Sequence, residues 1–143
     1  MTGHRQGAEA RWSAARQWFS KADDDLAVAG RCLAGRRPLV ESAAFHCQQA
    51  IEKMLKGLLA AAGTVPPRIH DVGTLLPLVV SRYQSLGAPL SRIPAMTTWY
   101  IVSRYPDDLD PIGPSKQDVS ATLRVARSLR RSIRRVDPVE NES

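Results

Sequence analysis

Residues 38–62 have the sequence PLVESAAFHCQQAIEKMLKGLLAAA, whose pattern is that of one amphipathic helix. At 100° per residue, its small and aliphatic side chains gather on one side, as the core of a helical bundle requires. The other side mixes an aromatic ring, an imidazole, an amide, a carboxylate and two amines. Such a mixture can both donate hydrogen bonds and carry charge. It consists of Ser42, Phe45, His46, Gln49, Glu52, Lys53 and Lys56.

The remainder of the chain also has helical periodicity. Apolar residues predict further helices over about residues 11–34, 71–83, 91–104 and 115–136. Sustained alternation and Asn-Gly or Asp-Gly turns, the usual strand signals, are absent. We therefore expect an all-α fold: a single-domain, up-and-down bundle of four long helices and one short helix over residues 11–136. Residues 1–10 and 137–143 are expected to be flexible tails.

Residues at the expected helix ends support these boundaries. Gly63 is typical of the position after a helix, and Asp71 and Ser115 are typical N-caps. Pro77 requires the third helix to start late or to kink. The sequence Gly87-Ala88-Pro89 is expected to break the chain, and Tyr105-Pro106 is expected to end the fourth helix.

Composition restricts the class of protein and its partners. The formal net charge is +6, which favours anionic partners such as RNA, nucleotides or an acidic protein. Cys32 and Cys47 form no CxxC motif, and we expect both to be reduced core residues of a cytoplasmic protein. The N-terminus lacks the apolar run of a signal peptide, and no stretch has the roughly 18 apolar residues needed to span a membrane.

Several enzyme classes are excluded by their missing motifs. The chain has no GxGxxG, GxxxxGK[ST], HExxH or GxSxG sequence. Its three histidines and two scattered cysteines give no zinc-ligand spacing. We therefore expect no metal and no cofactor.

The polar side of residues 38–62 has two interpretations. It is either a solvated face, in which Glu52 pairs with Lys56 at i,i+4, or a binding site. The presence of Phe45 and His46 favours the site. Arg104-Tyr105 is likewise either a helix end before an acidic loop, or an arginine placed to bind phosphate beside a tyrosine that stacks on a base.

Three other polar features have simpler explanations. His70 precedes the N-cap Asp71 and can pack under the loop. The run Asp23-Asp24-Asp25 cannot converge on one cation, because successive helical residues point in different directions, and we expect it to be solvated. The arginines of the last helix form either a solvated face or a track for a phosphate backbone. They are Arg124, Arg127, Arg131 and Arg134.

Four segments, taken in order, resemble the HEPN domain family over about residues 15–136. The resemblance implies a helical bundle that usually dimerises and binds nucleotides or RNA. Many members are metal-independent ribonucleases, and many prokaryotic members are paired with a minimal nucleotidyltransferase, some as toxin and antitoxin. The segments are Ala22 with Asp25-Leu26, residues 44–56 (AFHCQQAIEKMLK), residues 67–71 (PRIHD) with Leu75-Leu76, and Tyr100 with residues 103–107 (SRYPD).

The resemblance also implies the residues of a polar cleft. It would be lined by His46, Gln49, Lys53, Lys56, His70, Arg104 and Tyr105, with Phe45 or Tyr105 stacking on a base. One departure concerns catalysis, because the arginine followed four to six residues later by histidine, typical of the ribonuclease branch, is absent.

We therefore expect a nucleotide- or RNA-binding module, a homodimer acting with a nucleotidyltransferase partner in a toxin–antitoxin-like pair. One alternative is a divergent metal-independent ribonuclease, in which Arg104 stabilises charge and His46 or His70 acts as acid or base. The other is a purely structural dimerisation and interaction module.

Overall fold

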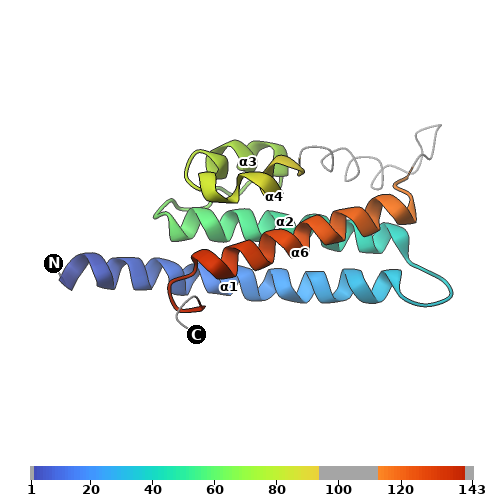
Figure 1. The fold of residues 1–143 in the computed structure, drawn as a ribbon, viewed down its shortest axis with the longest axis horizontal. Coiled ribbons are helices and arrows are strands. Elements are labelled where there is room, and N and C mark those ends of the chain that lie inside the picture. The colour runs from blue at the N-terminus through green and yellow to red at the C-terminus, as the bar shows by residue number, and fades with distance from the viewer. Residues whose placement is uncertain (1, 94–112, 141–143) are drawn as a thin grey trace.

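The fold is built on two long antiparallel helices that a third long helix crosses (Figure 1). The computed structural model describes residues 2–93 and 113–140, and these contain no strand. Helix α1 (Thr2–Leu33) pairs with α2 (Val40–Ala61), and α6 (Lys116–Val136) packs on both. Helix α3 (Val72–Val80), the 3-10 turn η1 (Gln84–Leu86) and α4 (Gly87–Ser91) complete the described part, with α3 packed on α2. The predicted all-α class is confirmed.

The core lies between α1 and α2 and is closed by α3, α4 and α6. Phe19 of α1 is buried against α2, where Gly57 leaves room for its ring. A Cβ at Gly57 would overlap that ring, so a glycine is required for the close approach of the two helices. Fully buried aliphatic side chains surround this contact, and they include Ile51, Met54, Leu55, Leu58, Leu75, Leu90, Leu129 and Ile133.

Three of the predicted helix ends are confirmed. Gly63 follows α2 with a φ of +84°, a left-handed conformation that glycine adopts without strain. The Asp71 side chain caps α3 by accepting hydrogen bonds from Gly73 N at 3.1 Å and from Thr74 Oγ1 at 2.6 Å. Ser115 and Asp118 form a reciprocal capping box at the start of α6.

Two boundaries differ from the sequence-based expectation, and one of the two alternatives for Pro77 is ruled out. α1 begins at Thr2, well before residue 11, because nothing in this polar stretch stops a helix. The expected break at Gly87-Ala88-Pro89 is instead helix α4, in which Pro89 lies in the first turn, where a missing N–H costs no intrahelical bond. α3 contains Pro77 but does not start late. Except for its first residues, the helix expected over 91–104 lies outside the described residues.

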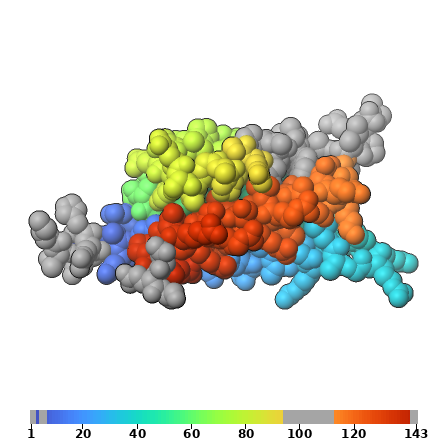
Figure 2. All heavy atoms as spheres, in the orientation of Figure 1, coloured from blue at the N-terminus to red at the C-terminus, as the bar shows by residue number. Residues whose placement is uncertain are grey.

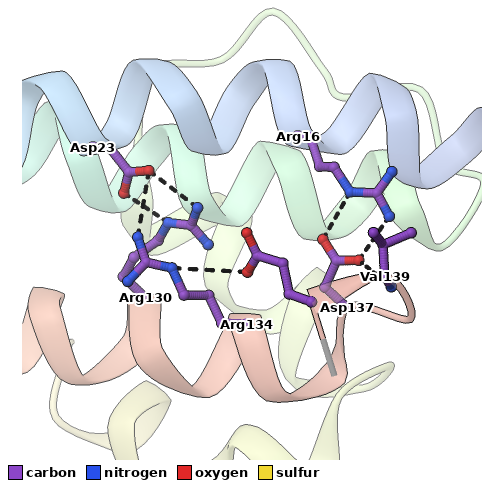
Figure 3. Close-up of polar contacts among 7 residues, drawn as sticks. Arg16, Asp23, Arg130, Arg134, Asp137 and Val139 are labelled. Atoms are coloured by element: carbon purple, nitrogen blue, oxygen red, sulfur yellow. Dashed lines mark hydrogen bonds and ion pairs between the residues drawn. The ribbon is translucent and has the colours of Figure 1, made fainter. Parts of the chain in front are cut away.

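Arginine forks fasten α6 to α1 (Figure 3). Arg130 Nε donates to Asp23 Oδ1 at 2.7 Å, and its Nη2 donates to Oδ2 at 3.1 Å. Arg16 donates in the same way to Asp137, at 2.9 and 2.7 Å. This bond lowers the pKa of the Asp137 carboxyl and raises that of the Arg16 guanidinium. Asp137 is 2% exposed, so the chain does not leave the bundle there as the predicted tail would.

Among the helices that the structure describes, none is both long enough and apolar enough to cross a membrane.

Candidate functional site

The polar side of α2 faces α1, where Asp25 holds two of its side chains. His46 Nδ1 lies 2.8 Å from Asp25 Oδ1, and Lys53 Nζ donates to Asp25 Oδ2 at 2.5 Å. His46 and Lys53 are two turns apart on α2, so one carboxylate bridges both. Asp25 is only 8% exposed, which corrects the expectation of a solvated aspartate run. Asp25 lies about 200° around α1 from Asp23, so it turns toward α2 while Asp23 turns toward α6.

A second carboxylate, Glu52 of α2, gathers three more polar side chains. Its Oε1 lies 3.1 Å from Lys56 Nζ and 2.8 Å from His70 Nδ1, while Gln49 Nε2 donates to Oε2 at 3.5 Å. The predicted i,i+4 pair of Glu52 and Lys56 is confirmed. The two residues are 3% and 5% exposed, however, so this part of the helix is not a solvated face.

Two aromatic rings border these carboxylates. Lys56 Nζ lies 5.7 Å from the ring centroid of Trp18, a cation–π arrangement. Phe45 meets the His46 ring edge-on at 5.3 Å and is 39% exposed. Phe45 therefore has a free surface on which a planar group could stack. We call the whole arrangement the polar cluster, composed of Trp18, Asp25, Phe45, His46, Gln49, Glu52, Lys53, Lys56 and His70.

The carboxylates fix the hydrogen-bonding state of both imidazoles. An ionised carboxylate only accepts hydrogen bonds, so the Nδ1 atoms of His46 and His70 carry hydrogens and donate to Asp25 and Glu52. In the neutral imidazole, Nε2 is then the acceptor. No described residue hydrogen-bonds to either Nε2. Each histidine thus presents one open acceptor nitrogen on an oriented ring.

The fixed charges of the polar cluster cancel. Asp25 and Glu52 contribute two negative charges, and Lys53 and Lys56 contribute two positive charges. The described side chains of this site therefore contribute no net positive charge, and a ligand would be held there by individual hydrogen bonds, ion pairs and stacking. The net charge of +6 resides elsewhere on the molecule.

Thiolate chemistry is excluded at this site, although Cys47 follows His46 in the chain. Burial raises the pKa of the Cys47 thiol to about 12, so it stays protonated near neutral pH. Cys47 and the half-buried Cys32 are both free. Within residues 2–93 and 113–140, no group of three or more His, Cys, Asp or Glu side chains is placed to hold a metal ion.

The structure brings six of the predicted site residues together. They are Phe45, His46, Gln49, Lys53, Lys56 and His70. Arg104 and Tyr105 lie outside the described residues. Sequence reasoning missed the positioning role of Asp25 and the contact of Trp18 with Lys56. The available signal was their spacing, because residues seven apart share one face of a helix.

A family model for the HEPN domain matches residues 15–136, which include the polar cluster and run from α1 to the end of α6. The chain belongs to the HEPN family. It is thus a helical module of a family associated with nucleotides and RNA, as the resemblance implied. No curated protein and no solved structure matches the chain.

Proposed function

We propose that this HEPN domain binds a nucleotide, free or within RNA, at the polar cluster. The observation that carries the proposal is the pair of buried carboxylates, each of which orients an imidazole and an ammonium group, with the exposed Phe45 ring against His46. Buried carboxylates are costly unless they are paired, so such an arrangement is more typical of a site than of a core. Membership of the HEPN family supports the same ligand class.

The exposure of each side chain suggests how the work is divided. Lys53, whose side chain is 26% exposed, meets phosphate, while Phe45 stacks on the base and Gln49 contacts a base or ribose edge. Lys56 is buried and acts through Glu52. His70, with its side chain 75% exposed, lies at the rim. Arg104 and Tyr105 complete the proposal as a further phosphate contact and a second stacking ring.

Binding of a labelled mononucleotide at low salt tests this proposal, because electrostatic contacts are strongest there. We expect Lys53→Met to weaken binding at least tenfold by removing the phosphate contact. Lys21→Met is the matched control, because Lys21 is exposed and bonds to no described residue. Wild-type protein that binds no nucleotide at low salt would leave the purely structural interaction module as the better description.

The proposal includes a homodimer that acts with a nucleotidyltransferase partner in a toxin–antitoxin-like pair. Its support is the family match and the resemblance to HEPN proteins of that kind. Light scattering of the purified chain tests the dimer. Co-purification with the product of any neighbouring nucleotidyltransferase gene tests the partner, and a monomer that captures no such protein would refute this part.

A second function, metal-independent RNA cleavage, is favoured by one observation. Both imidazoles have Nδ1 fixed by a carboxylate and Nε2 open, as a general base requires. His46 or His70 would act as acid or base, and Arg104 would stabilise the developing phosphate charge. Cleavage of RNA in the presence of a chelator, lost in His46→Gln, His70→Gln or Arg104→Ala, would establish it. An inactive wild type would refute it.

A further inference from the structure

The outer surface of α6 carries the positive charge that the polar cluster lacks. Four arginines there are exposed, and none forms an ion pair with a described residue. By contrast, Arg130 and Arg134 of the same helix form ion pairs with Asp23, and Arg134 also lies 3.8 Å from Glu140. We call the four residues Arg124, Arg127, Arg131 and Arg135 the arginine face.

The arginine face is a continuous stripe along the helix. At 100° per residue its members lie within an arc of about 80°, and from Arg124 to Arg135 they span about 16 Å of helix axis. In Figure 2, α6 runs along the surface of the molecule, uncovered by the other described helices on the side shown. Four guanidinium groups are therefore presented together in one direction.

A close approach between α1 and α6 holds one of these guanidinium groups in place. Arg127 lies across α1 at Gly30, where an added Cβ would be 2.7 Å from its Nη2 atom. Because the helix offers no side chain there, the guanidinium can lie against the backbone of α1 while remaining exposed. This orders Arg127 in advance and lowers the entropy lost when it binds an anion.

The neighbours of the arginine face favour a nucleic acid over a protein partner. The exposed large hydrophobic residues of the described chain all lie outside α6, whereas the core of a protein interface is rich in aromatic and apolar groups. Gln117 and Ser120 precede Arg124 on α6, Ser128 lies between Arg127 and Arg131, and all three are at least partly exposed. Arginine, serine and glutamine are the side chains that contact phosphates and sugars.

We propose that the arginine face is a second RNA-contacting surface that binds the phosphate backbone of a single strand without reading its sequence. The proposal takes only the ligand class, RNA, from the proposed function. The two surfaces are distinct, because Asp23, which pairs with α6, and Asp25, in the polar cluster, are about 200° apart around α1. A mononucleotide therefore occupies the polar cluster alone, and a polynucleotide also uses the arginine face.

Salt titration of binding tests this inference with two probes, a labelled mononucleotide and an oligouridine of about twelve nucleotides. The variant is Arg124→Gln with Arg131→Gln. The control is Arg82→Gln with Arg92→Gln, which removes the same charge from exposed arginines outside α6. Each phosphate contact contributes about 0.7 to the slope of log affinity against log salt for a single strand. We expect the α6 variant to flatten the oligouridine slope by about 1.4 and the control to leave it unchanged.

The outcomes separate this inference from the proposed function. The inference is overturned if the oligouridine slope falls equally in the α6 variant and the control, or if it is unchanged in the α6 variant. Mononucleotide binding would still support the polar cluster in either case. An α6-dependent slope without mononucleotide binding supports the inference and refutes the proposed site. Competition by polyglutamate as strong as that by oligouridine overturns the RNA assignment in favour of an acidic protein partner.

Discussion

α1 forms ion pairs on two opposite sides, and the two sides use different chemistry. Toward α6, Asp23 and Arg16 take part in bidentate arginine–carboxylate forks, which occupy both oxygens of each carboxylate (Figure 3). Toward α2, Asp25 receives one bond from an imidazole and one from an ammonium group. Neighbouring residues of α1 thus have two roles: the pairs toward α6 hold the helices together, and the pairs toward α2 orient the side chains of the polar cluster.

The difference lies in what remains available after the pair has formed. A fork fixes the planar guanidinium against both carboxylate oxygens, which sets the relative position of the two helices and stabilises their packing. An imidazole held at Nδ1 keeps Nε2 free, and a lysine ammonium has three donors, of which a single carboxylate contact uses one. Carboxylates that orient partners with unused hydrogen-bonding capacity are therefore the better indication of a ligand site.

The largest stability effect is expected on the α2 side, from Glu52→Gln. This change leaves the Lys56 ammonium buried without an opposite charge, and breaking a buried pair costs about 3 kcal/mol of unfolding free energy. Urea denaturation measures the loss. The double variant Glu52→Gln with Lys56→Met should recover most of it, because the unpaired charge is gone. Additive losses in the double variant would show that the pair is not the cause.

On the α6 side, Asp23→Ala should reduce stability by about 2 kcal/mol and leave nucleotide binding intact. The smaller value reflects the 36% exposure of the Asp23 side chain, which lets water reach the unpaired Arg130. Thermal unfolding and mononucleotide titration of the same sample check both halves of the prediction. Asp24→Asn should change neither. A loss of nucleotide affinity in Asp23→Ala would mean that the two sides are coupled.

A glycine lies in each of the two contacts of α1, Gly57 in the contact with α2 and Gly30 in the contact with α6. Substitution by alanine should change stability differently at the two positions. Gly57→Ala places a methyl group in the ring of the buried Phe19, and overpacking of this kind should cost about 1.5 kcal/mol. Gly30→Ala meets only the exposed far end of the long Arg127 side chain, which can turn aside into solvent, so the gain in helix propensity should leave stability unchanged or higher. Equal losses in denaturant unfolding of the two variants would contradict this difference.

The sequence predicted the fold well because helical signals are local. Apolar periodicity, the caps at Asp71 and Ser115 and the glycine at residue 63 depend on neighbours within one or two turns, and the structure confirms them. The break predicted at Gly87-Ala88-Pro89 was wrong for the same reason. A proline is compatible with a first helical turn, and Pro89 lies in the first turn of α4, which directly follows η1.

The polar cluster was predictable only on the helix that carries most of it. Seven of its members follow from the pattern of α2 and the segment before α3. Asp25, by contrast, is one of three consecutive aspartates whose different fates depend on which helices pack on α1. The burial of Arg130 has the same origin. An arginine on a helix is usually expected at the surface, and Arg130 is buried only because α6 packs on α1 and places Asp23 opposite it. Long-range pairing of this kind leaves no signal in a single sequence.

The smallest expected effect on stability is that of acid on the ion pair between Arg16 and Asp137, on the α6 side of α1. Because Arg16 lowers the pKa of Asp137, the ionised carboxyl stabilises the fold above its ordinary pKa of 3.8, and this contribution disappears as the pH falls through the lowered value. Arg16 is one-third exposed, so we expect about 1 kcal/mol. Asp137→Asn should therefore be less stable than wild type at neutral pH and equal to it in strong acid.

Urea unfolding of both proteins across the acid range measures this difference, and Asp24→Asn shows how much any exposed carboxyl contributes. No gap at any pH would mean that the shape of Asp137 and its bond from Val139 N, both kept by asparagine, account for its contribution, and a constant gap would mean that the amide destabilises the junction for a reason other than the lost charge. A gap that closes in acid would identify the junction of α1 with the end of α6 as a place where lower pH weakens the bundle. That junction is on the side of α1 that faces α6, so this effect of acid is separate from the polar cluster on the side that faces α2.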